Sequence, residues 1–362
     1  MTKKFFAASL AFIAVISPAA VSASVKWGSA ALRQPAEWYA SKEARAAADS
    51  VLTYQSDVGA WPKNTDLFVP VTDATVADIQ KEGKANTIDN GATTTPIRFI
   101  ALVAAGGAKD AKYREAVLRG VDYLLASQYA NGGFPQFYPL RESGYYSHIT
   151  YNDDAMINAL ELLRDVAQAN PSFAFVDKRR RERARDAVAR GIDVILKTQV
   201  RQDGKLTAWC AQHDEVTLAP AWARAYEPPS LSGDESVGIV RFLMAIEKPS
   251  PQVVTAIESA VSWFRAVPIT GQRLESVRRE DGRNERFLVP DPAAPPLWAR
   301  FYELGTNRPL YMDRDSKPHY DFSEIGYERR SGYNYHGTWP ASLLGHDYPA
   351  WRARIGGAQV SP

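Results

Sequence analysis

Apolar residues recur at three- to four-residue spacing in seven segments of the chain, which is the pattern of amphipathic helices. These segments are 36–56, 92–105, 112–128, 154–168, 178–199, 235–247 and 252–266. Long stretches rich in Gly, Pro, Asn and aromatic residues separate them, notably 57–91, 129–151, 200–233 and 268–296. Loops of this length in an ordered protein usually have a function. The pattern predicts a mainly helical fold with long irregular loops and little β-structure, apart from a short hairpin around 272–289.

A glutamine followed by a turn and an aromatic residue recurs at the end of three predicted helices. The tracts are Gln55–Pro62 (QSDVGAWP), Gln128–Pro135 (QYANGGFP) and Gln199–Trp209 (QVRQDGKLTAW), with glutamines 73 and 71 residues apart. A regular step of two helices and one loop builds an α/α toroid, in which each unit buries its apolar face against the next. We therefore expect an incomplete (α/α) barrel, with the glutamines bonded to backbone groups at helix ends.

The first residues have the features of a secretory signal peptide. Lys3 and Lys4 precede an apolar run over 5–15, and Val21-Ser22-Ala23 supplies small residues for cleavage after Ala23. The alternative is a membrane anchor, but the run is shorter than the ~20 residues that span a bilayer. The sequence thus predicts a signal peptide at 1–23, a single domain at 24–362, and a soluble product that is secreted or periplasmic.

Composition excludes several classes of protein. With 362 residues, 45% hydrophobic and 23% charged, the chain can bury a core and is not mainly disordered. Removing Lys3 and Lys4 leaves 41 basic and 41 acidic residues, which is not the basic excess of a nucleic-acid binder. The single cysteine, Cys210, cannot form an internal disulfide. We expect neither a nucleic acid nor a membrane as a partner.

Acidic residues stand directly before three of the predicted helices. Asp89-Asn90 precedes the second segment, 152–154 (NDD) precedes the fourth, and 232–235 (SGDE) is a capping signal before the sixth. The simplest interpretation of the first two is that they are helix N-caps. Two carboxylate clusters at equivalent turns of neighbouring repeats would, however, converge on one rim of a toroid. Their oxygens would suit calcium, which accepts carboxylate, carbonyl and water ligands.

Arginines and aromatic residues form a second pattern. The tracts 222–227 (WARAYE) and 298–303 (WARFYE) are 76 residues apart, and Arg308 and Arg314 follow. A guanidinium presents a planar fork to a carboxylate. The chain also has 9 Trp, 17 Tyr and 14 Phe, and flat aromatic faces suit sugar rings. The pattern favours an anionic polysaccharide as the ligand, while surface pairing of each arginine with an acid is the alternative.

Several of these tracts resemble the polysaccharide lyase family 10 pectate lyases. The motifs are Trp61–Asn64 (WPKN), Thr87–Thr93 (TIDNGAT), Asn131–Gln136 (NGGFPQ), Ile149–Met156 (ITYNDDAM), Leu231–Gly233 (LSG) and Phe301–Pro309 (FYELGTNRP). The resemblance extends over about residues 30–345. It implies an α/α toroid and calcium-dependent cleavage of α-1,4-polygalacturonate by β-elimination, which gives 4,5-unsaturated oligogalacturonates.

The resemblance also implies roles for individual residues. Asp89 matches the family's calcium-binding aspartate, and Asn90 beside it contacts the substrate site. Asp153 resembles a second acidic ligand, with Asp154 as the alternative. The remaining matches are arginines: Arg314 for the Brønsted base, and Arg224 and Arg300 for binding of uronate carboxylates. Because a guanidinium loses its proton only at high pH, an arginine base predicts an alkaline rate optimum.

Two other functions remain open from the residues alone. One is a glycoside hydrolase on the same toroid, which would use paired carboxylates such as Asp153 with Asp214 or Glu227. The other is a non-catalytic pectin-binding protein. We expect the chain to act as a monomer.

Overall fold

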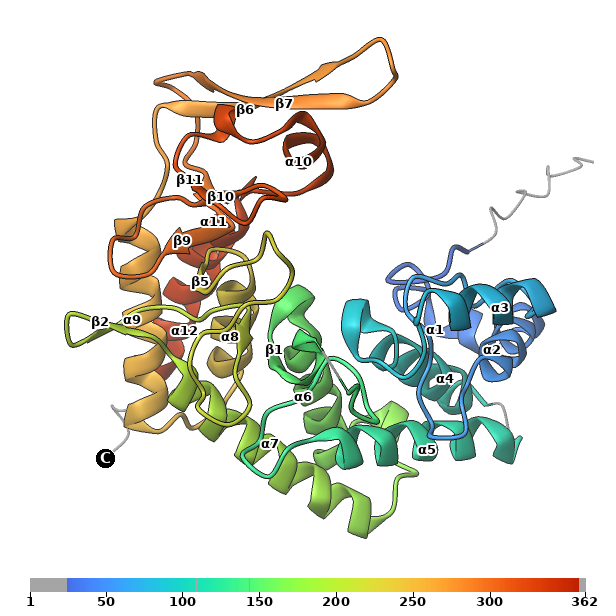
Figure 1. Cartoon of the computed structure of the whole chain (residues 1–362). Coiled ribbons are helices and arrows are strands. Elements are labelled where there is room, and N and C mark those ends of the chain that lie inside the picture. The colour runs from blue at the N-terminus through green and yellow to red at the C-terminus, as the bar shows by residue number, and fades with distance from the viewer. Residues whose placement is uncertain (1–24, 108–109, 143, 358–362) are drawn as a thin grey trace, which may run out of the picture.

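The computed structural model describes residues 25–107, 110–142 and 144–357 (Figure 1). The predicted signal peptide at 1–23 lies outside these ranges. The α-helices of the described part are α1 (Ala36–Tyr39), α2 (Lys42–Thr53), α3 (Asp73–Lys81), α4 (Thr94–Ala105), α5 (Ala111–Ser127), α6 (Ala155–Ala167), α7 (Lys178–Thr198), α8 (Glu235–Met244), α9 (Pro251–Ala266), α10 (Tyr327–Gly332), α11 (Trp339–Ser342) and α12 (Tyr348–Gly357). The seven predicted helical segments are all confirmed.

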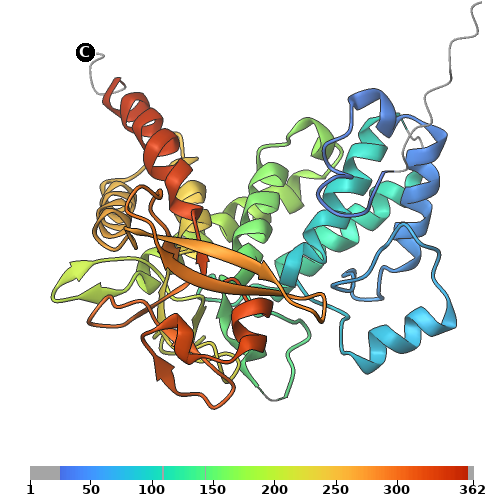
Figure 2. The ribbon, with the colours of Figure 1, turned by 90° about the horizontal axis from the view of Figure 1, so that it is seen from above.

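The main helices form two layers. In one layer α4 packs on α6 and α6 on α8, and in the other α2 packs on α5, α5 on α7 and α7 on α9. Each helix of the first layer also packs on the helix that follows it in sequence. Figures 1 and 2 show the two ends of this array, α2 and α9, on opposite sides of the molecule, so the ring does not close. The fold is the predicted incomplete α/α toroid.

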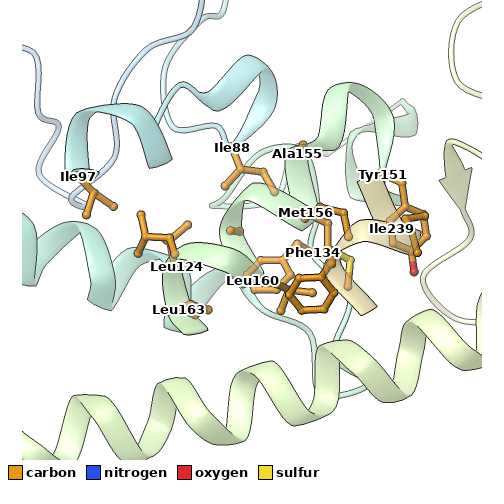
Figure 3. Close-up of a cluster of buried hydrophobic side chains, with 14 of the residues drawn as sticks. Ile88, Ile97, Leu124, Phe134, Tyr151, Ala155, Met156, Leu160, Leu163 and Ile239 are labelled. Atoms are coloured by element: carbon orange, nitrogen blue, oxygen red, sulfur yellow. The ribbon is translucent and has the colours of Figure 1, made fainter. Parts of the chain in front are cut away.

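The hydrophobic core lies where these two layers meet. Figure 3 shows Met156 and Leu160 of α6 beside Phe134, with Leu124 of α5 and Ile239 of α8 nearby. All five of these side chains are fully buried. Burial of apolar area is the main favourable term in folding, and the apolar positions of each amphipathic segment supply it here.

The three glutamines tie neighbouring helices of the second layer together, as predicted. The side-chain Nε2 of Gln55 donates to the carbonyls of Gly59 (3.0 Å) and Ala116 (2.9 Å). Gln128 repeats this pattern, since its Nε2 donates to the carbonyls of Gly132 and Ala187. The Nε2 of Gln199 donates in the same way to the carbonyls of Thr207 and Ala256. In each case one bond closes the glutamine's own turn and the other reaches the next helix of the layer.

Two glycines allow the glutamine turns to touch the next helix. Gly59 (φ 94°) and Gly132 (φ 97°) are in the left-handed region. A Cβ at Gly59 would lie 2.4 Å from the carbonyl oxygen of Arg119, and one at Gly132 would lie 2.1 Å from that of Arg190. Only glycine fits at these positions, because any other residue would meet backbone atoms at an impossible distance.

Antiparallel two-stranded pairs connect the loops between the helices. They are β1 (Ile149–Thr150) with β4 (Gln212–His213), β2 (Arg201–Gln202) with β3 (Lys205–Leu206), β5 (Ser230–Ser232) with β9 (Phe301–Glu303), β6 (Gln272–Arg278) with β7 (Asn284–Pro290), β8 (Trp298–Ala299) with β12 (His336–Gly337), and β10 (Tyr311–Met312) with β11 (Pro318–His319). The β6–β7 pair is the predicted hairpin, and β7 packs against α10. The β5–β9 pair brings the 230–235 tract next to the 298–303 tract.

Helix α3 was not predicted, and none of its residues is buried. It begins on a cap, the Thr72 hydroxyl, which accepts a hydrogen bond from the Thr75 amide. Cys210 is buried and free, in agreement with the expected absence of an internal disulfide. Among the described residues, every helix is too short or too polar to reach across a bilayer.

Candidate active site

Two tight turns present acidic residues at the starts of neighbouring helices. The 3-10 turn η1 (Asp89–Gly91) precedes α4, and η3 (Asn152–Asp154) precedes α6. Asn90 (φ 50°) and Asp153 (φ 52°) are both in the left-handed region, and the residues after them, Gly91 and Asp154, are as well. Asn and Asp tolerate this conformation better than other residues with a side chain. The two turns share one backbone conformation and are packed together.

The capping interpretation of these acids is wrong. The N-cap position of α4 is Thr93 and that of α6 is Asp154, and neither helix has a side-chain cap hydrogen bond. Asp89 and Asp153 are therefore not engaged in capping. The third predicted helix start is confirmed, since α8 begins at Glu235. Its N-cap residue, Asp234, makes no side-chain cap hydrogen bond either, but the Ser232 hydroxyl accepts hydrogen bonds from the amides of Asp234 and Glu235.

Asp89 is buried and only half satisfied. Its side chain is 5% exposed, and Oδ2 lies 2.6 Å from the Lys63 ammonium. The other oxygen, Oδ1, is buried with no hydrogen-bond partner. Asn90 next to it is exposed, and its amide donates to Oδ1 of Asn64 (3.2 Å). The loop that contains Lys63-Asn64 thus contacts both residues of the predicted Asp89-Asn90 pair.

Arg300 forms ion pairs with carboxylates at the starts of two helices, α6 and α8. It lies between β8 and β9, is 8% exposed, and forms an ion pair with the Glu235 carboxylate. Its guanidinium is also 3.3 Å from Asp153 Oδ1 and 3.4 Å from Asp234 Oδ2. One buried cation therefore faces three acids. A single guanidinium does not balance three carboxylates, so an additional cation would be electrostatically favoured beside them.

The protonation of this cluster follows from burial. Loss of solvent raises the pKa of Asp153, although Arg300 opposes the rise. Burial, reinforced by the Glu235 charge, raises the pKa of Asp154 and of Asp234 to about 7. Burial alone would lower the pKa of Arg300, but the charges of Glu235, Asp234 and Asp153 hold it above its ordinary value. Arg300 is therefore a permanent cation in this site.

Asp153 and Asp154 occupy different surroundings. The Asp153 side chain is 40% exposed and contacts Arg300. Asp154 Oδ1 is instead buried without a partner, and it lies so close to Gly238 of α8 that a Cβ on that glycine would be 2.1 Å away. Of the two acids, Asp153 has the accessible carboxylate.

A second group of charges lies on the neighbouring loop. Arg224 Nε donates to Glu227 Oε2 (2.8 Å), and the Tyr333 hydroxyl donates to Glu227 Oε1 (3.1 Å). The hydrogen bonds that Arg224 donates to Glu227 raise the pKa of Arg224. The Tyr333 ring lies 5.2 Å from the Arg300 guanidinium. Tyr333 thus connects the Arg224 pair to the Arg300 cluster.

Arg314 and Arg224 both contact the ring of Tyr226. The Arg314 guanidinium lies 5.5 Å from the Tyr226 ring, and that of Arg224 lies 4.9 Å from the same ring. Arg329 packs between Tyr226 (3.8 Å) and Tyr333 (4.6 Å). Arg314 itself is largely exposed and is paired with Glu328. The hydrogen bonds that Arg314 donates to Glu328 raise the pKa of Arg314.

The structure brings most of the predicted residues together through these contacts, while Arg308 lies apart, against Tyr320 (3.7 Å). Residues that sequence reasoning did not place in the site are Lys63, Asp234, Glu235, Tyr226, Arg329, Tyr333 and Glu328. The 232–235 tract was interpreted as a capping signal, which concealed the pairing of Glu235 with Arg300. A cavity of about 840 Å³ lies elsewhere, between the ends of α7 and α9, and none of the predicted site residues lines it.

Two of the carboxylates named for a hydrolase, Asp214 and Glu227, have lowered pKa values. Asp214 accepts hydrogen bonds from the amides of Val216 and Thr217, and these bonds lower its pKa. Burial would raise the pKa of Glu227, but Arg224 holds it below its usual range. A general acid needs a raised pKa, so neither residue suits that role.

Comparisons with known proteins agree with this geometry. The family model for pectic acid lyase matches residues 55–344. A solved family 10 polysaccharide lyase from Cellvibrio cellulosa is 36% identical, with a TM-score of 0.73 over 92% of this chain and 99% of the other. An aspartate-to-alanine mutant of a family 10 polysaccharide lyase from the same organism, in complex with trigalaturonic acid, is 37% identical, with a TM-score of 0.74 over 87% of this chain and 97% of the other. No curated protein matches the chain.

Proposed function

Since the chain belongs to the pectic acid lyase family and to the family 10 polysaccharide lyases within it, we propose that it cleaves α-1,4-polygalacturonate by calcium-assisted β-elimination. The observation that carries this proposal is the arrangement of Asp89 and Asp153. Both acids stand at helix starts without capping them, and a buried arginine and further arginines lie close by. Such a site offers oxygens to a cation and guanidinium groups to an acidic sugar.

The residues present fit calcium. Calcium takes oxygen ligands in flexible geometry, and Asp89 Oδ1 is a buried carboxylate oxygen without a partner. Asp89 and Asp153 would hold the ion. A bound calcium ion would supply positive charge that neutralises the uronate carboxylate and stabilises the charge that develops next to it.

Arg300 and Arg224 would bind uronate carboxylates. Arg300 is fixed by its three acidic neighbours, so its position requires little reorganisation when the substrate arrives. Arg224 is held by Glu227 but is more exposed, with 46% of its side chain accessible. Asn90 would contribute a hydrogen bond from its exposed amide.

Arg314 would act as the base. In its neutral form it would take the proton from C5 of the galacturonate, next to the C6 carboxylate. The electrons of the C5–H bond would form the C4–C5 double bond while the C4–O4 bond breaks, and O4 would leave with the rest of the polymer and take a proton from solvent. Because Glu328 raises the pKa of Arg314, the reaction should be fastest at alkaline pH.

One assay separates this proposal from the other functions. The protein is incubated with polygalacturonate, with and without EDTA, and the ultraviolet absorbance of the unsaturated product is followed. Absorbance that requires calcium supports the lyase. Reducing ends without absorbance would indicate a hydrolase, and binding without either signal would indicate a non-catalytic pectin-binding protein.

We also propose that the enzyme is exported as a monomer with one catalytic domain at 24–362. The signal-like residues 1–23 support export, and the continuous helical array supports one domain. Mass spectrometry of the exported protein would locate the cleavage site, and size-exclusion chromatography would give the oligomeric state.

A further inference from the structure

The backbone around Lys63 is held firmly, so its side chain has a defined reach. The Lys63 amide donates to the carbonyl of Lys84 (3.0 Å), and its own carbonyl accepts from the Thr65 hydroxyl (3.0 Å). Trp61, two residues earlier, is fully buried. Only the flexible four-carbon side chain of Lys63 is free to change position.

That side chain ends on the acid expected to bind calcium. The ammonium lies 2.6 Å from Asp89 Oδ2, and the Lys63 side chain is only 21% exposed. Among the described residues, Lys63 is the only cationic partner of Asp89 within ion-pair distance. A divalent cation on this carboxylate would stand within a few ångströms of the ammonium, and the two positive charges would repel each other.

We propose that Lys63 is a built-in counter-ion of Asp89, which holds the carboxylate when no divalent cation is bound and leaves it when calcium binds. This inference rests on the proposed function, because it takes calcium to be the competing cation. Lys63 suits the role, since an ammonium is a compact point charge on a flexible stem. It compensates a buried carboxylate that would otherwise be unpaired.

A second contact, with an aromatic ring, is available to the Lys63 ammonium. The ammonium already lies 5.3 Å from the face of the Phe137 ring, which can hold a cation after the ion pair breaks. From there it would meet a uronate carboxylate bound in the site. Calcium binding would release the ammonium for the substrate, and substrate binding would keep it off Asp89. Calcium and oligogalacturonate would therefore bind cooperatively, each increasing the affinity for the other.

The test is calorimetric titration of calcium into the whole protein in the absence of substrate. Lys63→Met removes the competing charge, so we expect calcium to bind about tenfold more tightly, the factor that corresponds to one charge-assisted hydrogen bond. Lys63→Gln keeps a neutral donor and should have the same direction of effect, whereas Lys63→Arg keeps the charge and should retain weak binding. Thermal unfolding of each variant checks that it is folded.

Lys84→Met is the matched control. Lys84 also lies 2.6 Å from an aspartate, Asp78, and its side chain is 20% exposed, but it does not touch Asp89. This variant removes one positive charge from the same region and should leave calcium affinity within about twofold of wild type.

A second titration measures cooperativity. Trigalacturonate should increase calcium affinity in the wild type by at least about fivefold more than it does in Lys63→Met. Wild-type calcium affinity in both Lys63→Met and Lys63→Gln, when both are folded, would overturn the role of Lys63. Calcium binding that survives in Asp89→Ala would instead overturn the calcium site of the proposed function, so the two failures are distinguishable.

Discussion

Arg314 and Glu328 form a two-point ion pair in which the arginine Nε and Nη2 donate to the two carboxylate oxygens, at 2.9 and 3.0 Å. The other groups facing Arg314 are the Asp313 carboxylate and the Tyr226 ring. A base must be free of its proton and of competing acceptors when the substrate binds. The pair with Glu328 therefore opposes the proposed role of Arg314 until it is broken.

We expect Glu328→Gln to move the rising limb of the pH–rate profile to lower pH. The substitution removes the charge that raises the pKa of Arg314, so the neutral guanidine becomes accessible at a lower pH. The measurement is the initial rate of absorbance increase across pH 7 to about 11, a range set by the pKa of a guanidinium. Glu324→Gln, an exposed carboxylate on the same segment that pairs with His319, is the control. An unchanged profile in Glu328→Gln would show that Glu328 does not tune the base.

Arg314→Lys should abolish turnover while substrate binding is kept. A general base contributes about 10²- to 10⁴-fold to a rate, and a lysine has neither the reach nor the planar geometry of a guanidinium. The rate constant is measured at saturating substrate, and the affinity for trigalacturonate is measured by calorimetry. Arg308→Lys changes an arginine that packs on Tyr320 outside the site, and it should be nearly as active as wild type. Near-normal turnover in Arg314→Lys would contradict the assignment.

Arg300→Met should destabilise the fold by about 3–5 kcal/mol, the cost of leaving buried charges without their partner. Asp153, Asp234 and Glu235 would then face one another without compensation. Urea unfolding in calcium-free buffer measures the loss. Adding Glu235→Gln to this variant should restore part of the stability. Arg273→Met, which breaks an exposed ion pair, should cost less than about 1 kcal/mol, and an equal loss in both variants would argue against a buried cluster.

Gln128→Leu should cost stability and leave catalysis unchanged. The substitution removes the two hydrogen bonds to the carbonyls of Gly132 and Ala187, at about 1 kcal/mol each or more where the carbonyl is left unpaired. It also removes the hydrogen bond that Gln128 Oε1 accepts from Arg190. Urea unfolding and the rate constant at saturating substrate are compared. Gln168→Leu, at an exposed glutamine at the end of α6, should change neither quantity. A drop in the rate constant with unchanged stability would assign Gln128 to the site instead.

The contribution of His213 to the free energy of unfolding should be lost as the pH is lowered from about 6.5 towards 4. His213 is fully buried, and burial lowers its pKa to about 4. The pKa of His213 is lower in the folded than in the unfolded chain, so the stability that the neutral imidazole contributes is fully present above pH 6.5. This contribution, roughly 3 kcal/mol, is lost as the pH falls through 4. Urea unfolding at several pH values measures this loss. The difference in stability between wild type and His213→Gln should shrink by this amount from pH 6.5 to 4, whereas the difference between wild type and His346→Gln, at an exposed histidine, should stay constant.

The helices and the repeat could be predicted from sequence because their causes are local or periodic. Apolar spacing identifies α4 to α9, and the turns at Gln55, Gln128 and Gln199 mark the repeat. Helix α3 was not predicted, and none of its side chains is buried. The positions of Asp89 and Asp153 before helices were also visible, but the capping interpretation was wrong, because neither α4 nor α6 has a side-chain cap hydrogen bond.

The ion pairs of the site could not be predicted from spacing. Lys63 meets Asp89 from a loop whose course depends on contacts with Lys84 and Thr65. Glu235 begins α8, and the β5–β9 pairing brings Arg300 to it. Long-range pairing of short strands has no periodic signature, so these partners appear only in the folded chain.

The contact between Asp153 and Arg300 joins residues 147 positions apart in the chain. Helices such as α6 and α7 form from local interactions, whereas this contact requires the loops on both sides of α8 and α9 to be in place. During refolding, the circular dichroism signal of the helices should therefore recover before the enzyme can turn over substrate. Activity consequently reports on completion of the whole fold.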